Sequence, residues 1–99
     1  MTQVVSYSWT EQSVFQAVAK LLAQVAPLKV TGPVFPETSL AEDLDFDSLD
    51  AIDMVAAVNE YFSIALDFEA WITEESQLSG KAFTIGSLCR SIMSALGRE

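Results

Sequence analysis

Residues 43–53, with the sequence DLDFDSLDAID, bring five carboxylates and one hydroxyl group together within eleven residues. Carboxylates at this spacing can hold a metal ion, form an acidic surface, or flank a serine that another enzyme modifies. Ser48 is a poor catalytic nucleophile, because the chain has no histidine to act as its base and no lysine close by in the sequence. No glycine elbow or oxyanion loop accompanies it. These residues therefore predict a point of attachment, or else an ordinary serine at a helix start, and not an active site.

The first three aspartates of this segment, at positions 43, 45 and 47, match the opening of a calcium-binding loop. Such a loop needs a glycine at its sixth position for a sharp turn, and a bidentate glutamate at its twelfth. Here those two positions hold Ser48 and Met54. We therefore expect no metal site.

Length and composition predict one small folded domain over residues 1–99, with its first few residues flexible. The 51% hydrophobic content excludes a disordered acidic tail, despite a net charge of −9. Cys89 is the only cysteine, so a disulfide within the chain is impossible. Its helical phase, among apolar neighbours, predicts a buried and inert thiol. Without a recognisable secretory signal or a long apolar run, the protein is expected in the cytoplasm, as a monomer.

The charge of the chain is unevenly distributed. Residues 30–80 contain acids and no basic residue at all. Such a surface repels nucleic acids and anionic membranes, and favours basic patches on partner proteins, although acids can also simply keep a small domain soluble. The twelve carboxylates from Glu37 to Glu75 are expected to repel one another, which would raise their pKa values.

Hydrophobic periodicity predicts an amphipathic helix over residues 11–24, capped by Ser8 or Thr10 and closed by Pro27. The following stretch, up to residue 47, is rich in proline and has no sustained period. It is interpreted as a long ordered loop with at most one helical turn, at residues 40–44. Long loops inside compact domains are often functional.

The C-terminal third predicts a short helix from Phe68 to residue 72 or 74, a turn at Ser79-Gly80, and a last helix opened by Thr84 and ended by Gly97. No stretch predicts a strand. The expected fold is therefore all-α, a small four-helix bundle with three main helices, one short helix and a long first loop.

The helix predicted over residues 48–62, with Asp47 as its N-cap, has two apolar faces on a helical wheel. One face is expected in the core and contains Met54, Val55, Val58, Tyr61 and Phe62. The other is bordered by acids and contains Leu49, Asp50, Ile52, Asp53, Ala56 and Glu60. Apolar side chains with an acidic rim are typical of a docking surface for a basic partner. Alternatively, the long loop buries Leu49 and Ile52.

At this helix the sequence resembles the acyl carrier proteins and the related peptidyl carrier domains. Their signature is close to D-L-G-x-D-S-L-[DE], and here Asp43-Leu44 precedes Asp47-Ser48-Leu49-Asp50. The resemblance covers most of the chain, including the amphipathic first helix, the long loop and a final helix that begins near Thr84. A D-S-L triplet alone is a weak signal, but it is a specific one in this order on an acidic all-α chain.

The resemblance implies that Ser48 receives 4′-phosphopantetheine from coenzyme A through a magnesium-dependent phosphopantetheinyl transferase, which recognises Asp47. The arm would carry acyl or aminoacyl groups as thioesters, and the protein itself would not be an enzyme. The face of Leu49, Asp50, Ile52, Asp53, Ala56 and Glu60 would bind loading ligases, synthases and transferases. An unmodified acidic adaptor for basic proteins is the alternative.

Two departures from the family pattern favour a specialised lipid, polyketide or peptide pathway over housekeeping fatty acid synthesis. Asp45 replaces the usual glycine of the signature, and residues 63–83 form a longer connection than is typical. Phe68 and Trp71 in that connection either line a pocket for the cargo or belong to the core.

Overall fold

The computed structural model describes residues 9–78 and 80–97. It has four helices: α1 (Glu11–Val25), α2 (Ser48–Phe62), α3 (Phe68–Ser76) and α4 (Ile85–Gly97). The described residues form no strand, apart from an isolated bridge between Ser39 and Thr84. The predicted all-α fold is therefore confirmed. The predicted flexibility of the first few residues and the predicted turn at Ser79 fall on residues outside the described part.

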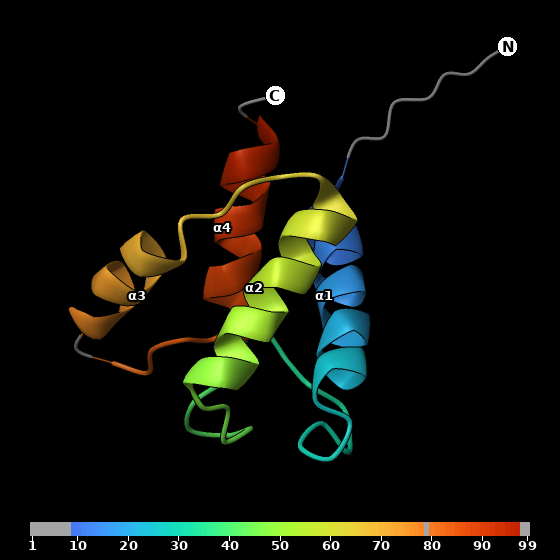
Figure 1. Ribbon diagram of the computed structural model, residues 1–99, viewed down its shortest axis with the longest axis vertical. Coiled ribbons are helices and arrows are strands. Elements are labelled where there is room, and N and C mark those ends of the chain that lie inside the picture. The colour runs from blue at the N-terminus through green and yellow to red at the C-terminus, as the bar shows by residue number, and fades with distance from the viewer. Residues whose placement is uncertain (1–8, 79, 98–99) are drawn as a thin grey trace, which may run out of the picture.

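Three helices form the body of the molecule, and α3 lies to one side of it (Figure 1). Helix α1 packs against both α2 and α4. Their apolar faces meet in a core whose most buried large side chains are Val14, Val18, Leu22, Met54, Val58, Ile85, Leu88 and Ile92. Cys89 joins this core, and burial raises the pKa of its thiol to about 11. The predicted burial of this cysteine is thereby confirmed, and a raised thiol pKa disfavours the reactive thiolate.

Each main helix starts at a side-chain cap. Thr10 caps α1 by accepting a hydrogen bond from the Ser13 amide, whereas the alternative cap, Ser8, lies outside the described residues. Asp47 caps α2 as predicted. Thr84 caps α4, because its hydroxyl accepts a bond from the Ser87 amide at 3.1 Å. These caps satisfy backbone N–H groups that a helix leaves without partners.

One residue of the predicted core face of α2 is on the surface. The side chain of Tyr61 is 53% exposed, while Met54, Val55, Val58 and Phe62 are buried. The ring of Tyr61 instead packs edge-on against Phe62. Its hydroxyl can then stay hydrated, which explains why the prediction for Tyr61 was wrong.

The long first loop is ordered by backbone bonds to the start of α4. The Leu40 amide donates to the Phe83 carbonyl at 2.8 Å, and the Ile85 amide donates to Thr38 at 2.9 Å. Residues 40–43 form a single hydrogen-bonded turn, in which the Asp43 amide donates to the Ser39 carbonyl at 2.9 Å. This is the i to i+4 bond of one helical turn, so the turn lies where the sequence predicted it. The buried hydroxyl of Ser39 donates to the Ala82 carbonyl at 2.8 Å. The loop is thus held beside α4, and leaves Leu49 and Ile52 uncovered.

Helix α3 extends to Ser76, beyond the predicted end at residue 72 or 74. Its last turn contains Glu75, which is only 6% exposed. One carboxylate oxygen of Glu75 accepts the Phe83 amide at 2.6 Å, and the other accepts the Ser87 hydroxyl at 2.6 Å. Bonds to residues far along the chain therefore stabilise this turn. None of the described helices is long and apolar enough to cross a bilayer.

Candidate functional site

Ser48 is the first residue of α2, and its side chain is exposed. The residues around it form a reciprocal cap. The carboxylate of Asp47 accepts the Asp50 amide at 2.9 Å, and the carboxylate of Asp50 accepts the Asp47 amide at 3.2 Å. The start of α2 is thereby fixed by residues on either side of Ser48, while Ser48 itself stays exposed. The first turn of a helix favours an anionic group there, such as a phosphate on this hydroxyl.

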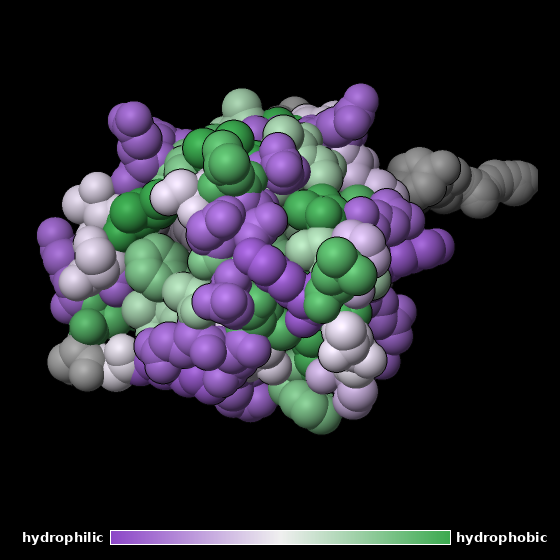
Figure 2. Space-filling model, turned by 60° about the horizontal axis from the view of Figure 1, so that its bottom comes forward, coloured by the Kyte–Doolittle hydropathy of each residue, from purple (hydrophilic) through white to green (hydrophobic). Residues whose placement is uncertain are grey.

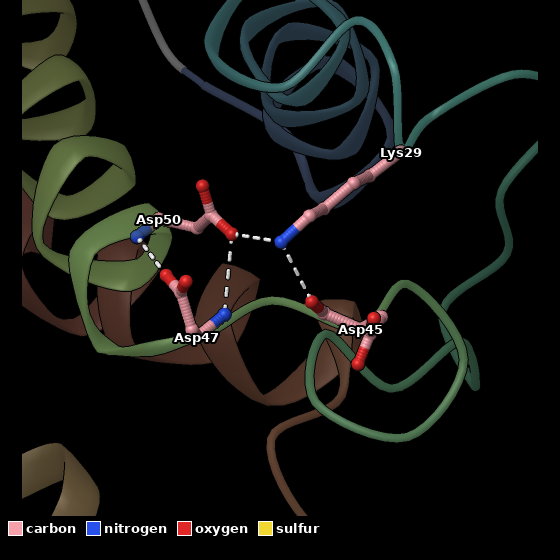
Figure 3. Close-up of polar contacts among 4 residues, drawn as sticks. All are labelled: Lys29, Asp45, Asp47 and Asp50. Carbon is pink, nitrogen blue, oxygen red and sulfur yellow. Dashed lines mark hydrogen bonds and ion pairs between the residues drawn. The ribbon is translucent and has the colours of Figure 1, made fainter.

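Lys29, from the end of the first helix region, joins the loop to this helix start (Figure 3). Its ammonium group donates to the Asp45 carbonyl at 2.8 Å and to the Asp50 carboxylate at 2.5 Å. Both charged side chains are partly buried, with exposed fractions of 33% and 22%. One lysine thus links three segments: the turn that follows α1, the loop at Asp45, and the first turn of α2.

Asp45 has a left-handed backbone, with φ of 58°. This conformation costs an ordinary L-residue roughly 1–2 kcal/mol, and aspartate tolerates it better than most. It also explains why the family signature has glycine here, since glycine adopts it freely. The departure noted in the sequence therefore lies at a strained turn, whose carbonyl is held by Lys29.

Two aspartates of the segment have lowered pKa values, contrary to the expected mutual repulsion. The bond from Lys29 lowers the pKa of Asp50, aided by the Asp47 amide. The bond from Lys81 lowers the pKa of Asp43, aided by the Ser39 amide. The prediction of raised pKa values was wrong for both, because lysines distant in sequence fold back onto them.

The docking face predicted on α2 is open to solvent. Leu49 is 71% exposed and Ile52 49% exposed, and Asp53, Ala56 and Glu60 are exposed as well. Asp50 differs, because it is half-buried and engaged by Lys29. Figure 2 looks toward the end of the molecule where α2 begins, and shows a broad hydrophilic patch with hydrophobic side chains exposed on either side. The loop therefore does not bury the second apolar face.

A small apolar pocket opens beside Ser48, between the first turn of α2 and α3. Its volume is about 160 Å³. It is lined mainly by apolar and aromatic side chains: Leu40, Ala41, Phe46, Asp47, Ser48, Ala51, Phe68, Trp71, Ile72 and Phe83. Trp71 is buried and belongs to the core, while Phe68 is half-buried against it. Trp71 is thus a core residue, and both aromatics also line this pocket, whereas its use by a cargo stays a prediction.

Comparison with known proteins identifies the family. A family model for the phosphopantetheine attachment site matches residues 16–77. The acyl carrier protein AcpXL of Mesorhizobium japonicum is 34% identical over 83 residues, covering 79% of this chain and 86% of that protein. AcpXL of Brucella melitensis is 32% identical over 85 residues, covering 81% and 88%. AcpXL of Rhizobium etli is 32% identical over 81 residues, covering 79% and 87%.

The chain belongs to the phosphopantetheine-binding acyl carrier proteins. Its cofactor is a covalently attached 4′-phosphopantetheine, as predicted. The protein is therefore a carrier of acyl intermediates, and the adaptor alternative is not favoured. Membership also implies that a phosphopantetheinyl transferase and acyl-handling enzymes bind this acyl carrier protein.

Sequence reasoning missed three residues that shape this region of the carrier protein. Lys29 was noted only as a charge, although it bonds both Asp45 and Asp50. Phe83, with φ of 58°, walls the pocket and stacks edge-on against Trp71 at 5.4 Å. Glu75 was counted as one more surface acid. An acid or a lysine has no sequence pattern that reveals a partner many residues away.

Proposed function

We propose that Ser48 is the residue of this acyl carrier protein that bears the 4′-phosphopantetheine arm. The observation that carries the proposal is the exposed hydroxyl of Ser48 at the first residue of α2, inside the region that the family model matches. Asp47, which caps the same helix start, is the acidic neighbour recognised by the transferase. The terminal thiol of the arm holds the cargo as a thioester, and the protein carries it without catalysing its conversion.

The experiment is modification of the purified chain with coenzyme A, Mg²⁺ and a broad-specificity phosphopantetheinyl transferase. Intact mass spectrometry is expected to show the addition of one arm, and peptide mapping to locate it on Ser48. A chain that gains no arm, or gains it at another serine, would contradict the proposal.

We further propose that Leu49, Ile52, Asp53, Ala56 and Glu60 form the surface that partner enzymes bind, with Asp50 at its edge. Reversal of the two exposed acids, Asp53→Lys with Glu60→Lys, is expected to weaken binding to a basic transferase, chiefly through a slower on-rate. Leu49→Ala is expected to weaken it by about 1–2 kcal/mol through loss of an apolar anchor. Surface plasmon resonance measures the on-rate and the affinity of each variant, and thermal melts show whether each variant is folded.

The control for these variants carries the same charge change on α3, Glu69→Lys with Glu74→Lys, because both residues are exposed. It is expected to leave the on-rate closer to that of the unchanged chain. If Leu49→Ala instead lowered the free energy of unfolding by the roughly 2–5 kcal/mol of a core leucine, this assignment of the surface would be wrong.

The apolar pocket beside Ser48 supports an acyl cargo over an aminoacyl one. Its volume of about 160 Å³ is similar to that of an engineered cavity that admits benzene, so it can hold about six carbons of an acyl chain and not a whole long chain. Each methylene buried there contributes about 0.8 kcal/mol. An octanoyl group on the arm is therefore expected to raise the melting temperature of the carrier by several degrees relative to the free-thiol form.

Ala51→Phe would fill this pocket from α2 and is expected to abolish the stabilisation by the octanoyl group. Ala70→Phe, at an exposed position of α3 that does not line the pocket, is the matched control. Equal melting temperatures for the octanoyl and free-thiol forms of the unchanged chain would exclude the pocket as the cargo site. The relatives reported above are named AcpXL, which supports a dedicated acyl pathway.

A further inference from the structure

We propose that Lys29 is a positioning residue for the modification of Ser48, because it holds the left-handed turn at Asp45 and the first turn of α2 in one arrangement. The inference rests on the proposed attachment at Ser48. It concerns how this chain presents the serine to the transferase, and not which groups the transferase itself contributes.

The first step is the geometry of the turn. Asp45 lies three residues before Ser48 and has φ of 58°, a conformation that L-residues avoid. Its carbonyl accepts a bond from the Lys29 ammonium at 2.8 Å. A carbonyl held from outside the turn fixes the peptide plane that follows Asp45. Lys29 therefore stabilises a backbone conformation that glycine would adopt without help.

The second step is the cap of the helix. The same Lys29 ammonium contacts the Asp50 oxygen that also accepts the Asp47 amide (Figure 3). Asp45, before Ser48, and Asp50, after it, are thereby bonded to the same ammonium group. Charge-assisted bonds of this kind are stronger than neutral ones. The Ser48 backbone thus lies between two points that Lys29 restrains, and a nucleophile presented in one geometry reacts faster than one that samples many.

A positioning role and a charge role make different predictions for transfer kinetics. Lys29→Met makes an acidic surface more negative, so by charge alone it should bind a basic transferase as well or better. If Lys29 positions Ser48, kcat should fall about tenfold, the effect of roughly one charge-assisted bond, while KM does not rise. Lys29→Arg, which can donate to both acceptors, is expected to restore most of kcat. Lys20→Met, the same charge change at an exposed position of α1, is the control.

Asp45→Gly provides the coupling test. Glycine removes the strain of the turn, so Asp45→Gly alone should retain kcat. When Lys29→Met is combined with Asp45→Gly, kcat should fall much less than it does in Lys29→Met alone. Purely additive effects of the two substitutions would overturn the proposal. Equal kcat values for Lys29→Met and Lys20→Met would overturn it as well.

Hydrogen exchange of the unmodified chain tests the same restraint without any transferase. Amides of residues 44–51 are expected to exchange several-fold faster in Lys29→Met than in the unchanged chain or in Lys20→Met. Unchanged exchange would refute the restraint. If the arm were mapped to another residue, the proposed function would fail, whereas the exchange result would still decide whether Lys29 fixes this loop.

The pH dependence of stability is a second readout of the pair. The bond to the Asp50 carboxylate raises the pKa of Lys29, aided by the charges of Asp50, Asp47 and Asp45 nearby, and the same bond lowers the pKa of Asp50. A lowered carboxyl pKa stabilises the fold above about pH 4, and this contribution is lost as pH falls through the folded pKa. The melting temperatures of the unchanged chain and Lys29→Met should differ at pH 7 and converge toward pH 3. A difference that is the same at both values would exclude the ion pair as its cause.

Discussion

Ser48→Ala is expected to abolish attachment of the arm, while the helical circular dichroism stays essentially unchanged. The substitution removes the only hydroxyl group in residues 43–53, and alanine is an excellent residue for the first turn of a helix. Asp47, and not Ser48, caps α2. The free energy of unfolding should therefore change by less than about 1 kcal/mol. Intact mass after incubation with coenzyme A and transferase gives the result.

The control for this experiment is Ser76→Ala, because Ser76 is another exposed serine at a helix end. It should acquire the arm like the unchanged chain. An Ser48→Ala protein that still gained one arm would show that the attachment residue is misassigned. One that gained none because it was unfolded would be recognised by its lost dichroism, and Ser48→Gly would then replace it.

Glu75→Ala is expected to lower the free energy of unfolding by about 2–4 kcal/mol, the largest effect anticipated for any polar residue here. Glu75 is buried and accepts hydrogen bonds from the Phe83 amide and the Ser87 hydroxyl. The Ser87 hydroxyl in turn accepts a bond from the Trp71 indole at 3.1 Å. Removal of the carboxylate leaves these donors without their partner and leaves a cavity beside α4.

Chemical denaturation of Glu75→Ala and Glu74→Ala separates this network from the general effect of removing an acid. Glu74 is the exposed neighbour on α3, and its substitution should change stability by less than about 0.5 kcal/mol. The free energy of unfolding of Glu75→Gln should lie between those of the two alanine variants, because the side-chain amide keeps one acceptor oxygen. Similar stabilities for Glu74→Ala and Glu75→Ala would mean that the network contributes little to the fold.

Much of the fold was predictable, because helix signals are local. The 3.6-residue period of α1, α2 and α4, and the caps at Asp47 and Thr84, depend on residues only a few positions apart. The helical wheel that predicted the buried side of α2 also predicted its exposed side, which contains Leu49 and Ile52. Its single error, Tyr61, concerned a residue with an apolar ring and a polar tip, for which hydrophobicity alone does not decide burial.

Less of the site was predictable, because its contacts join distant residues. The pocket needs Phe68, Trp71 and Phe83 to approach Ala51, and the position of α3 depends on Glu75 reaching α4. The length of α3 was underestimated for the same reason. The hydrophobic pattern of one segment carries no information about hydrogen bonds from that segment to a distant segment.

The sequence by itself determined the type of protein: an acidic all-α carrier, its four helices, and a serine at the start of the second one. The acidic all-α fold and its helices follow from composition and periodicity, which act over a few residues, whereas the carrier role follows from the resemblance of the motif and of most of the chain to a known family. Only the tertiary structure decided how that serine is held, through Lys29 on the Asp45 carbonyl and the Asp50 carboxylate. It also decided which acids are free for partners and which are paired. Electrostatic and hydrogen-bond partners are set by distance in space, and the fold alone brings Lys29 within 2.5 Å of a residue 21 positions away.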